Sequence, residues 1–211
     1  MHYPTKRLLI VDDKECIRRT LSRVAAGLGF QVRSTHNGLS ALREIRLENP
    51  DFLLSDLNMP GMSGFELLSV VRRRFPAILV IAMSGTFRGS NVPSCVSADA
   101  FYQKGSSTSN LAQILRTPPK IRRHTQPDSD CASPLWIQRN PRDSSVTAQA
   151  RITCPECLRA FYYALDGLGS PTCNVECIHC GYSIQHSTSM VRPLDEIPSR
   201  AVRQIAGMAA D

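Results

Sequence analysis

The sequence predicts an α/β protein: a doubly wound parallel sheet of five strands, followed by a small β module that a metal ion stabilises. Three observations lead to this prediction. Short apolar segments alternate with amphipathic helical segments over residues 5–116, as in a parallel sheet that helices cover on both faces. Polar residues follow directly on several of the apolar segments. Two Cys-x2-Cys pairs lie in the last third of the chain.

The expected elements follow from hydrophobic periodicity. Short apolar runs bounded by turn residues indicate buried strands, and apolar residues recurring every three or four positions indicate helices. We expect strands at residues 8–11, 31–35, 52–54, 77–83 and 98–102. We expect helices at residues 14–28, 39–47, 64–71 and 110–116.

Carboxylates stand at the ends of the first and third expected strands. Asp12 and Asp13 follow the first, and Asp56 ends the third. In an open parallel sheet, ligands bind outside the carboxyl ends of the strands. Carboxylates held close together repel one another, unless a hard cation that prefers oxygen ligands, such as Mg2+, lies among them. The residues therefore predict a magnesium site, although Asp13 could instead cap the helix that begins at Lys14.

Polar residues also end the last two strands. Ser84 follows the fourth strand and Lys104 follows the fifth. With these residues, the sequence resembles the receiver domain of two-component response regulators over residues 5–116. The resemblance rests on Ile10-Val11-Asp12-Asp13, Asp56-Leu57-Asn58-Met59-Pro60-Gly61-Met62-Ser63-Gly64, Met83-Ser84-Gly85 and Lys104. It implies a flavodoxin-like sheet of strand order 2-1-3-4-5.

The resemblance assigns the first site to phosphoryl transfer. Asp56 would accept a phosphoryl group from a phosphohistidine on a sensor histidine kinase or a phosphotransfer protein. The side chains of Asp13 and Asp56 and the backbone carbonyl of Asn58 would hold Mg2+, and Asp12 would act through water. Such a domain is a switch rather than an enzyme with a turnover substrate.

The remaining site residues would sense the phosphoryl group. By resemblance, Lys104 supplies an ammonium group, Ser84 donates its hydroxyl to a phosphoryl oxygen, and Phe101 is the aromatic switch residue, although an aromatic residue on a strand could simply belong to the core. The sequence departs from the family at Gly105, where a proline is usual, and in the region from Ser84 to Lys104, which is short and contains Pro93. Output through this face is therefore not expected.

The second half of the chain divides at changes of composition. Residues 117–149 are rich in proline and polar residues and are expected to form a flexible linker, in which Trp136 could dock on a neighbouring domain. Residues 150–186 contain Cys154-Pro155-Glu156-Cys157 and Cys177-Ile178-His179-Cys180, and with these motifs they resemble a small bacterial zinc ribbon. Residues 187–211 form a tail in which residues 198–209 could be a short helix.

The cysteine spacing predicts a zinc site. Cys154 and Cys157 form one Cys-x2-Cys pair, Cys177 and Cys180 form the other, and 19 residues separate the pairs. This spacing is typical of a four-cysteine zinc site, and in so small a unit the metal would supply most of the folding free energy. Disulfide bonds are the alternative. Competing ligands are Cys173, His179 and His186.

Charge and hydropathy limit the output and the location. The apolar runs are too short to cross a membrane, so a cytoplasmic response regulator is expected. Residues 151–211 carry five basic and six acidic residues, which favours a protein partner for the ribbon over nucleic acid. Two alternatives stay open: DNA binding in a transcriptional regulator, or an inert tail on a phosphate sink. DNA binding would use Arg151, Arg159, Tyr162 and Tyr163.

Overall fold

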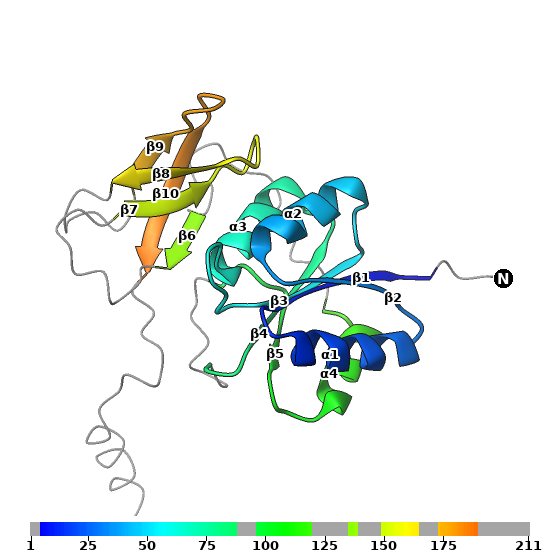
Figure 1. Cartoon of the computed structure of the whole chain (residues 1–211). Coiled ribbons are helices and arrows are strands. Elements are labelled where there is room, and N and C mark those ends of the chain that lie inside the picture. The colour runs from blue at the N-terminus through cyan, green and yellow to red at the C-terminus, as the bar shows by residue number, and fades with distance from the viewer. Residues whose placement is uncertain (1–4, 88–95, 120–134, 139–148, 165–172, 190–211) are drawn as a thin grey trace, which may run out of the picture.

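The structure is a computed structural model of the 211-residue chain. It describes residues 5–87, 96–119, 135–138, 149–164 and 173–189. Figure 1 shows a sheet flanked by helices, and beside it a smaller group of strands that belongs to the second half of the chain.

The first half forms a five-stranded parallel sheet. Its strands are β1 (Arg7–Val11), β2 (Gln31–Thr35), β3 (Phe52–Asp56), β4 (Leu79–Ser84) and β5 (Ala100–Gln103). The strand order is β2-β1-β3-β4-β5, and every pairing in this sheet is parallel. All residues of the central strand β3 are buried. The predicted fold class and strand order are therefore confirmed.

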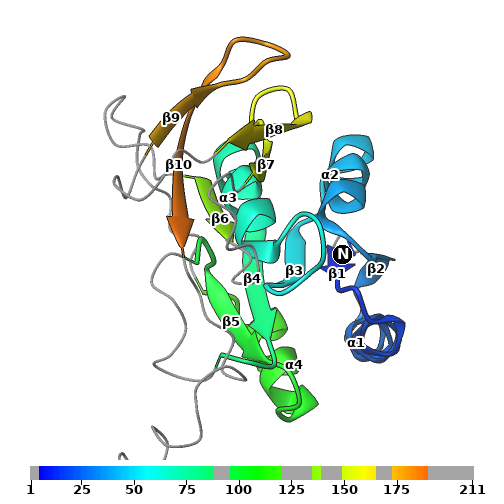
Figure 2. The ribbon, with the colours of Figure 1, turned by 60° about the vertical axis from the view of Figure 1, so that its left-hand side comes forward.

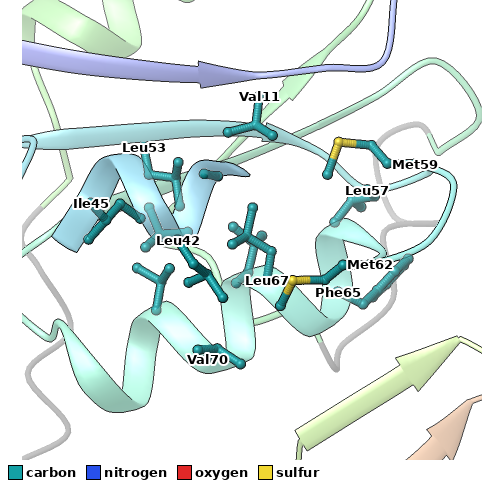
Figure 3. Close-up of a cluster of buried hydrophobic side chains, with 14 of the residues drawn as sticks. Val11, Leu42, Ile45, Leu53, Leu57, Met59, Met62, Phe65, Leu67 and Val70 are labelled. Carbon is teal, nitrogen blue, oxygen red and sulfur yellow. The ribbon is translucent and has the colours of Figure 1, made fainter. Parts of the chain in front are cut away.

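Helices cover both faces of this sheet. They are α1 (Glu15–Gly27), α2 (Gly38–Leu47), α3 (Gly64–Arg74) and α4 (Thr108–Arg116). Side chains alternate across a strand, so Leu8 and Ile10 of β1 join the apolar cluster that includes residues of α1 and α4. Leu9 and Val11 join the opposite cluster, with residues of α2 and α3. In Figure 3, Leu42 of α2 lies beside Leu67 of α3 in this second cluster.

The start of α3 is fixed against the end of β3. Ser63 caps the helix by accepting a hydrogen bond from the backbone N–H of Glu66 at 3.3 Å, a common way to satisfy a first-turn donor. A Cβ atom on Gly64 would lie 1.9 Å from the backbone oxygen of Asp56. Only glycine permits so close an approach. The position of α3 is therefore tied to the end of the strand that carries Asp56.

The second half forms a small all-β unit, here called the C-terminal module and consisting of residues 135–138, 149–164 and 173–189. Its strands are β6 (Leu135–Gln138), β7 (Gln149–Thr153), β8 (Ala160–Ala164), β9 (Cys173–Glu176) and β10 (Ser183–Ser189). Strands β7 and β8 form an antiparallel pair, while β10 pairs antiparallel with β9 and parallel with β6.

One strand of this module lies where a flexible linker was predicted. Strand β6 falls inside residues 117–149 and aligns Trp136 with Ser187 of β10. The sequence singled out Trp136 as a residue that could dock on a neighbouring domain, but it did not predict a strand there, because the segment is otherwise rich in proline and polar residues. The expected helix at residues 198–209 lies outside the described residues.

The C-terminal module packs against α3. Strand β6 contacts this helix, and Figure 2 shows the strands of the module along its outer side. Buried residues of the module belong to the same apolar cluster as α2, α3 and one face of the sheet. These residues are Ile152, Cys154, Phe161, Val175, Cys177 and Ile184. The module thus shares a core with the first domain.

None of the helices within the described residues is both long and apolar enough to cross a membrane.

Candidate functional site

Three carboxylates meet at the carboxyl ends of β1 and β3. Oxygen atoms of Asp12, Asp13 and Asp56 all lie within 4.8 Å of one another. Asp12 is 0% exposed and Asp56 is 4% exposed, whereas Asp13 is exposed. The N-cap of α1 is Lys14, and its backbone N–H donates to Asp12 at 2.9 Å. No side chain caps the first turn of α1 by a hydrogen bond, so the alternative role of Asp13 as a helix cap is wrong. Asp13 belongs to the acidic cluster instead.

Lys104 brings a positive charge to this cluster from the end of β5. Its Nζ atom lies 2.6 Å from Asp12 Oδ2 and 2.7 Å from Asp56 Oδ2. The Lys104 backbone N–H also donates to the Ser84 carbonyl at 2.9 Å. The ends of β1, β3, β4 and β5 are therefore joined around one point, as the positions of the polar residues in the sequence predicted.

The site suits a divalent cation. Burial raises the pKa of Asp56 above its usual range, although the Lys104 ammonium opposes this rise. Oxygen ligands around Mg2+ at about 2.1 Å lie roughly 3–4 Å apart in an octahedron, which fits the spacing of the three carboxylates. A bound Mg2+ would neutralise negative charge here. Asp12, Asp13 and Asp56 are the residues able to hold it.

Ser84 organises the backbone after β4. Its Oγ atom accepts hydrogen bonds from the backbone N–H groups of Thr86 at 3.1 Å and Phe87 at 3.4 Å. The Asn58 side chain donates to the Thr86 hydroxyl at 3.4 Å. Phe101 lies on β5, partly buried against the apolar cluster that α3 shares with the C-terminal module. Ser84 and Asp56 are the last residues of the parallel strands β4 and β3, so the Ser84 hydroxyl lies at the same end of the sheet as Asp56.

Arg18 is a site residue that the sequence analysis missed. Its Nη1 atom donates to the backbone carbonyls of Asp12 at 2.7 Å and Asp13 at 3.1 Å. These bonds hold the acidic loop on the first turns of α1. The available signal was the position of Arg18 one turn into the helix that follows the acidic pair.

The four predicted cysteines form a second cluster. Cys154 Sγ lies 3.7 Å from Cys180 Sγ, and Cys157 Sγ lies 3.7 Å from Cys177 Sγ. Sulfur atoms bound tetrahedrally to zinc at about 2.3 Å would be about 3.8 Å apart. A disulfide bond requires about 2.05 Å. The spacing therefore fits a tetrahedral metal such as Zn2+ and not the alternative of two disulfides.

The two pairs have matching backbone geometry. In each pair the fourth residue after the first cysteine donates its N–H to that cysteine's carbonyl: Leu158 to Cys154 at 2.9 Å, and Gly181 to Cys177 at 2.8 Å. Both residues have a left-handed backbone conformation, with φ of 58° at Leu158 and 72° at Gly181. Glycine adopts this conformation without a steric cost, and other residues rarely adopt it. Leu158 adopts the same conformation and packs partly against the shared apolar cluster.

Local hydrogen bonds and burial give the thiols different acidities. Burial raises the pKa of Cys154 to about 12. Burial also opposes ionisation of Cys177, but hydrogen bonds from the backbone N–H groups of His179 and Cys180 and from the Cys154 and Cys180 thiols together outweigh it and lower the pKa to about 7. The His179 N–H lies 3.4 Å from Cys177 Sγ. Such N–H donors stabilise a thiolate, which is the form that binds zinc.

The competing ligands lie apart from this cluster as far as the structure describes them. His179 is exposed, with its Nε2 atom 3.5 Å from the Ala160 carbonyl oxygen. His186 is buried on β10, and its ring packs edge-on against Tyr163 at 5.7 Å. Cys173 lies on β9, and its side chain is outside the described residues.

Comparison with protein families agrees with this geometry. A model of the response regulator receiver domain matches residues 8–116. The chain therefore belongs to the response regulator receiver domain family, a family of signalling domains rather than enzymes.

The chain is also similar to curated proteins of transcriptional regulation and chemotaxis. The DNA-binding transcriptional regulator NtrC of Escherichia coli K12 is 39% identical over 97 residues, which is 46% of this chain and 19% of that protein. The chemotaxis protein CheY of Pseudomonas aeruginosa is 38% identical over 82 residues, or 36% of this chain and 66% of that protein. The chain thus spans about a fifth of the length of the NtrC relatives that it matches.

Solved structures show the same fold. The response regulator TrrA of Thermotoga maritima, in complex with Mg(2+)-BeF, is 27% identical, with a TM-score of 0.50 over 53% of this chain and 97% of TrrA. TrrA has also been solved in complex with the histidine kinase ThkA. The chemotaxis response regulator CheY4 of Vibrio cholerae is 26% identical, with a TM-score of 0.50 over 53% of this chain and 97% of CheY4.

Proposed function

We propose that this chain is a cytoplasmic response regulator that takes a phosphoryl group from a histidine kinase or phosphotransfer protein onto Asp56. The observation that carries the proposal is the pairing of a buried Asp56 with Lys104 at 2.7 Å, beside two further carboxylates. The complex of TrrA with a histidine kinase supports a partner of this kind. In this proposal, residues 5–116 are the receiver domain.

The transfer would need positioning and charge neutralisation more than covalent help. The P–N bond of the phosphohistidine breaks as a carboxylate oxygen of Asp56 bonds to phosphorus, and the imidazole leaves. Lys104 offsets the charge of the new phosphoryl group. The Ser84 hydroxyl is the proposed donor to a phosphoryl oxygen, and Phe101 is the proposed switch residue. Mg2+, held by Asp13, Asp56 and the Asn58 carbonyl, would supply further positive charge.

Acetyl phosphate tests this assignment. Incubation of the full chain with labelled acetyl phosphate and Mg2+ should label one carboxylate, and Asp56→Asn should abolish the label. Asp51→Asn is a matched control, because Asp51 is an exposed carboxylate near the opposite end of β3, where it accepts from the Arg7 backbone N–H at 2.7 Å. Normal labelling of Asp56→Asn would contradict the proposal.

We also propose that the C-terminal module is a zinc ribbon. Four cysteines at tetrahedral spacing and two knuckles with matching backbone geometry support zinc. Elemental analysis of the purified full chain should give about one zinc per chain. Cys177→Ser should lower that value, whereas Cys16→Ser should not, because Cys16 is an exposed thiol on α1 outside the four-cysteine cluster. Full zinc content in the Cys177 variant would contradict the assignment.

The proposed partner of the module is a protein rather than nucleic acid. Of the residues expected to contact nucleic acid, Arg151 lies close to the buried carboxylate of Glu66 on α3 and interacts with it electrostatically. The described residues of the module contain two arginines and two glutamates, so they have no excess of positive charge to attract phosphate groups. Fluorescence anisotropy with a mixed-sequence DNA duplex tests this choice. Binding that weakens steeply with salt would favour the DNA-binding alternative.

A further inference from the structure

The contact between α3 and the C-terminal module is built from specific groups. The Glu66 side chain, 3% exposed, accepts a hydrogen bond at 2.8 Å from the backbone N–H of Thr153, the last residue of β7. Arg151 lies on the same strand, close enough to lower the pKa of Glu66. Arg74, in the last turn of α3, pairs with Glu156 at 3.7 Å. A buried acceptor that reaches a backbone N–H fixes how the module sits on the helix.

This contact is connected to the phosphorylation site by two short routes. The first is backbone, because Gly64 begins α3 directly against the Asp56 carbonyl. The second runs from Ser84, whose Oγ atom accepts a hydrogen bond from the backbone N–H of the buried residue Phe87. The Phe87 ring packs edge-on against Phe65 of α3, with ring centroids 6.1 Å apart. Phe65 immediately precedes Glu66.

The same apolar cluster encloses both ends of the second route. Phe65 and Phe87 belong to it, and so do Ile152 and Phe161 of the module, while Phe101 packs against it. A close-packed cluster transmits a displaced ring to its neighbours, because it has little free volume to absorb the change. The module is therefore sensitive to where Phe87 lies.

We propose that phosphorylation of Asp56 weakens the contact between α3 and the C-terminal module. This inference rests on the proposed function at Asp56 and extends it by naming the surface that responds. The Ser84 oxygen now accepts from Thr86 and Phe87 at 3.1 and 3.4 Å. When the Ser84 hydroxyl turns to donate to a phosphoryl oxygen, these two hydrogen bonds lengthen. The Phe87 backbone is then no longer held by Ser84, and the packing of the Phe87 ring against Phe65 changes. The docked module is the resting state, and phosphorylation favours its release.

Two neighbouring amides report docking separately from folding. The Thr153 N–H donates across the contact to Glu66, whereas the Cys154 N–H donates within the module to the Arg159 carbonyl at 2.9 Å. Release of an intact module exposes the first amide and leaves the second protected. Amide hydrogen exchange distinguishes them because it measures local opening.

The experiment is residue-resolved hydrogen exchange by NMR on the full zinc-loaded chain with Mg2+, with and without beryllofluoride as the phosphoryl mimic. With beryllofluoride, the Thr153 amide should exchange about 5-fold to 150-fold faster, which is the range typical of coupling between sites. The exchange rate of the Cys154 amide should not change. If beryllofluoride binds and the exchange rate of the Thr153 amide does not change, the coupling is wrong but the proposed function at Asp56 still stands. Absence of binding contradicts the proposed function, and with it the coupling. Faster exchange at both amides indicates unfolding of the module and overturns release.

A pair of matched variants tests the route. Phe87→Leu should reduce the response of Thr153 to beryllofluoride. Phe30→Leu is the control, because Phe30 makes a similar edge-on contact, 5.4 Å from Phe52, on the other face of the sheet. An equal response in the wild-type chain and both variants would exclude Phe87 as the connection. Because coupling is reciprocal, Glu66→Ala, which weakens docking, should bind beryllofluoride more tightly than the wild-type chain.

Discussion

Glu66 should make the stability of the chain depend on pH around neutrality. Burial raises the pKa of this carboxyl from its ordinary value of 4.5 to about 7, against the opposing effects of the Thr153 hydrogen bond and the Arg151 charge. A group whose pKa is higher in the folded state favours folding most below its unfolded pKa. That contribution is lost as the pH rises through the folded pKa. The contribution of Glu66 to the unfolding free energy is therefore lost between about pH 4.5 and about pH 7.

The size of the effect follows from that difference. At about 1.4 kcal/mol per unit of pKa, burying the ionised carboxylate costs roughly 3 kcal/mol above neutral pH. Glu66→Gln keeps an oxygen that can accept from Thr153 but cannot ionise. Relative to the wild-type chain, the variant should gain roughly 1 kcal/mol of unfolding free energy near pH 5 and about 3 kcal/mol near pH 8.

Urea denaturation of the full chain with excess zinc measures this difference. The sequence has one tryptophan, Trp136, on β6, so its fluorescence can follow the module. Glu156→Gln is the matched control, because the ion pair of Glu156 with Arg74 is about half exposed and such pairs contribute about 1 kcal/mol or less. A difference between Glu66→Gln and the wild-type chain that stays constant with pH would refute the reasoning. So would a variant less stable at pH 8, because the carboxylate charge would then be stabilising.

Three further predictions follow from the backbone and the cysteines. A Cβ atom at Gly64 would lie 1.9 Å from the carbonyl oxygen of Asp56. Gly64→Ala should therefore lower the unfolding free energy by roughly 2 kcal/mol or more, as expected for overpacking, and should reduce acetyl phosphate labelling of Asp56. Gly27→Ala, with no atom within 4 Å of the new Cβ, should lower neither the unfolding free energy measured in urea nor the labelling of Asp56. Gly181→Ala should weaken zinc binding in a chelator competition by about 1–2 kcal/mol, because φ is 72° there. Removing zinc with a chelator should abolish amide protection in β7 to β10 and preserve it in β1 and β3. Retained protection at Cys177 would contradict a folding role for the metal.

The first domain was predictable because its chemistry is local to strand ends. Asp12, Asp56, Ser84 and Lys104 each follow an apolar run, and parallel strands bring such ends together. The strand order itself came from resemblance. The positions of the hydrogen bonds could not be predicted, since the link from Ser84 to Phe87 depends on how the backbone turns after β4.

Apart from the possible docking of Trp136, the sequence analysis did not predict that the module packs on the first domain, although α3 carried a signal. A helix that covers one face of a sheet needs one apolar stripe, but α3 has apolar residues on more than one side. Its residues from Gly64 to Val71 are all buried. Glu66, an acidic residue in the first turn, is buried where the module contacts the helix. An acidic residue inside so apolar a helix was the available indication of a second packing partner.

The same helix joins the two halves of the chain in packing, and in our proposal it also couples their function. Its first residue touches the Asp56 backbone, and its second and third residues, Phe65 and Glu66, contact Phe87 and the Thr153 amide. A shift at the N-terminus of α3 cannot stay within the receiver domain, because those residues are shared with the module. The face of α3 that the module covers becomes available to a partner only when the module leaves. Any partner that binds this face must therefore compete with β6 and β7, and phosphorylation would favour that partner by weakening the competitor.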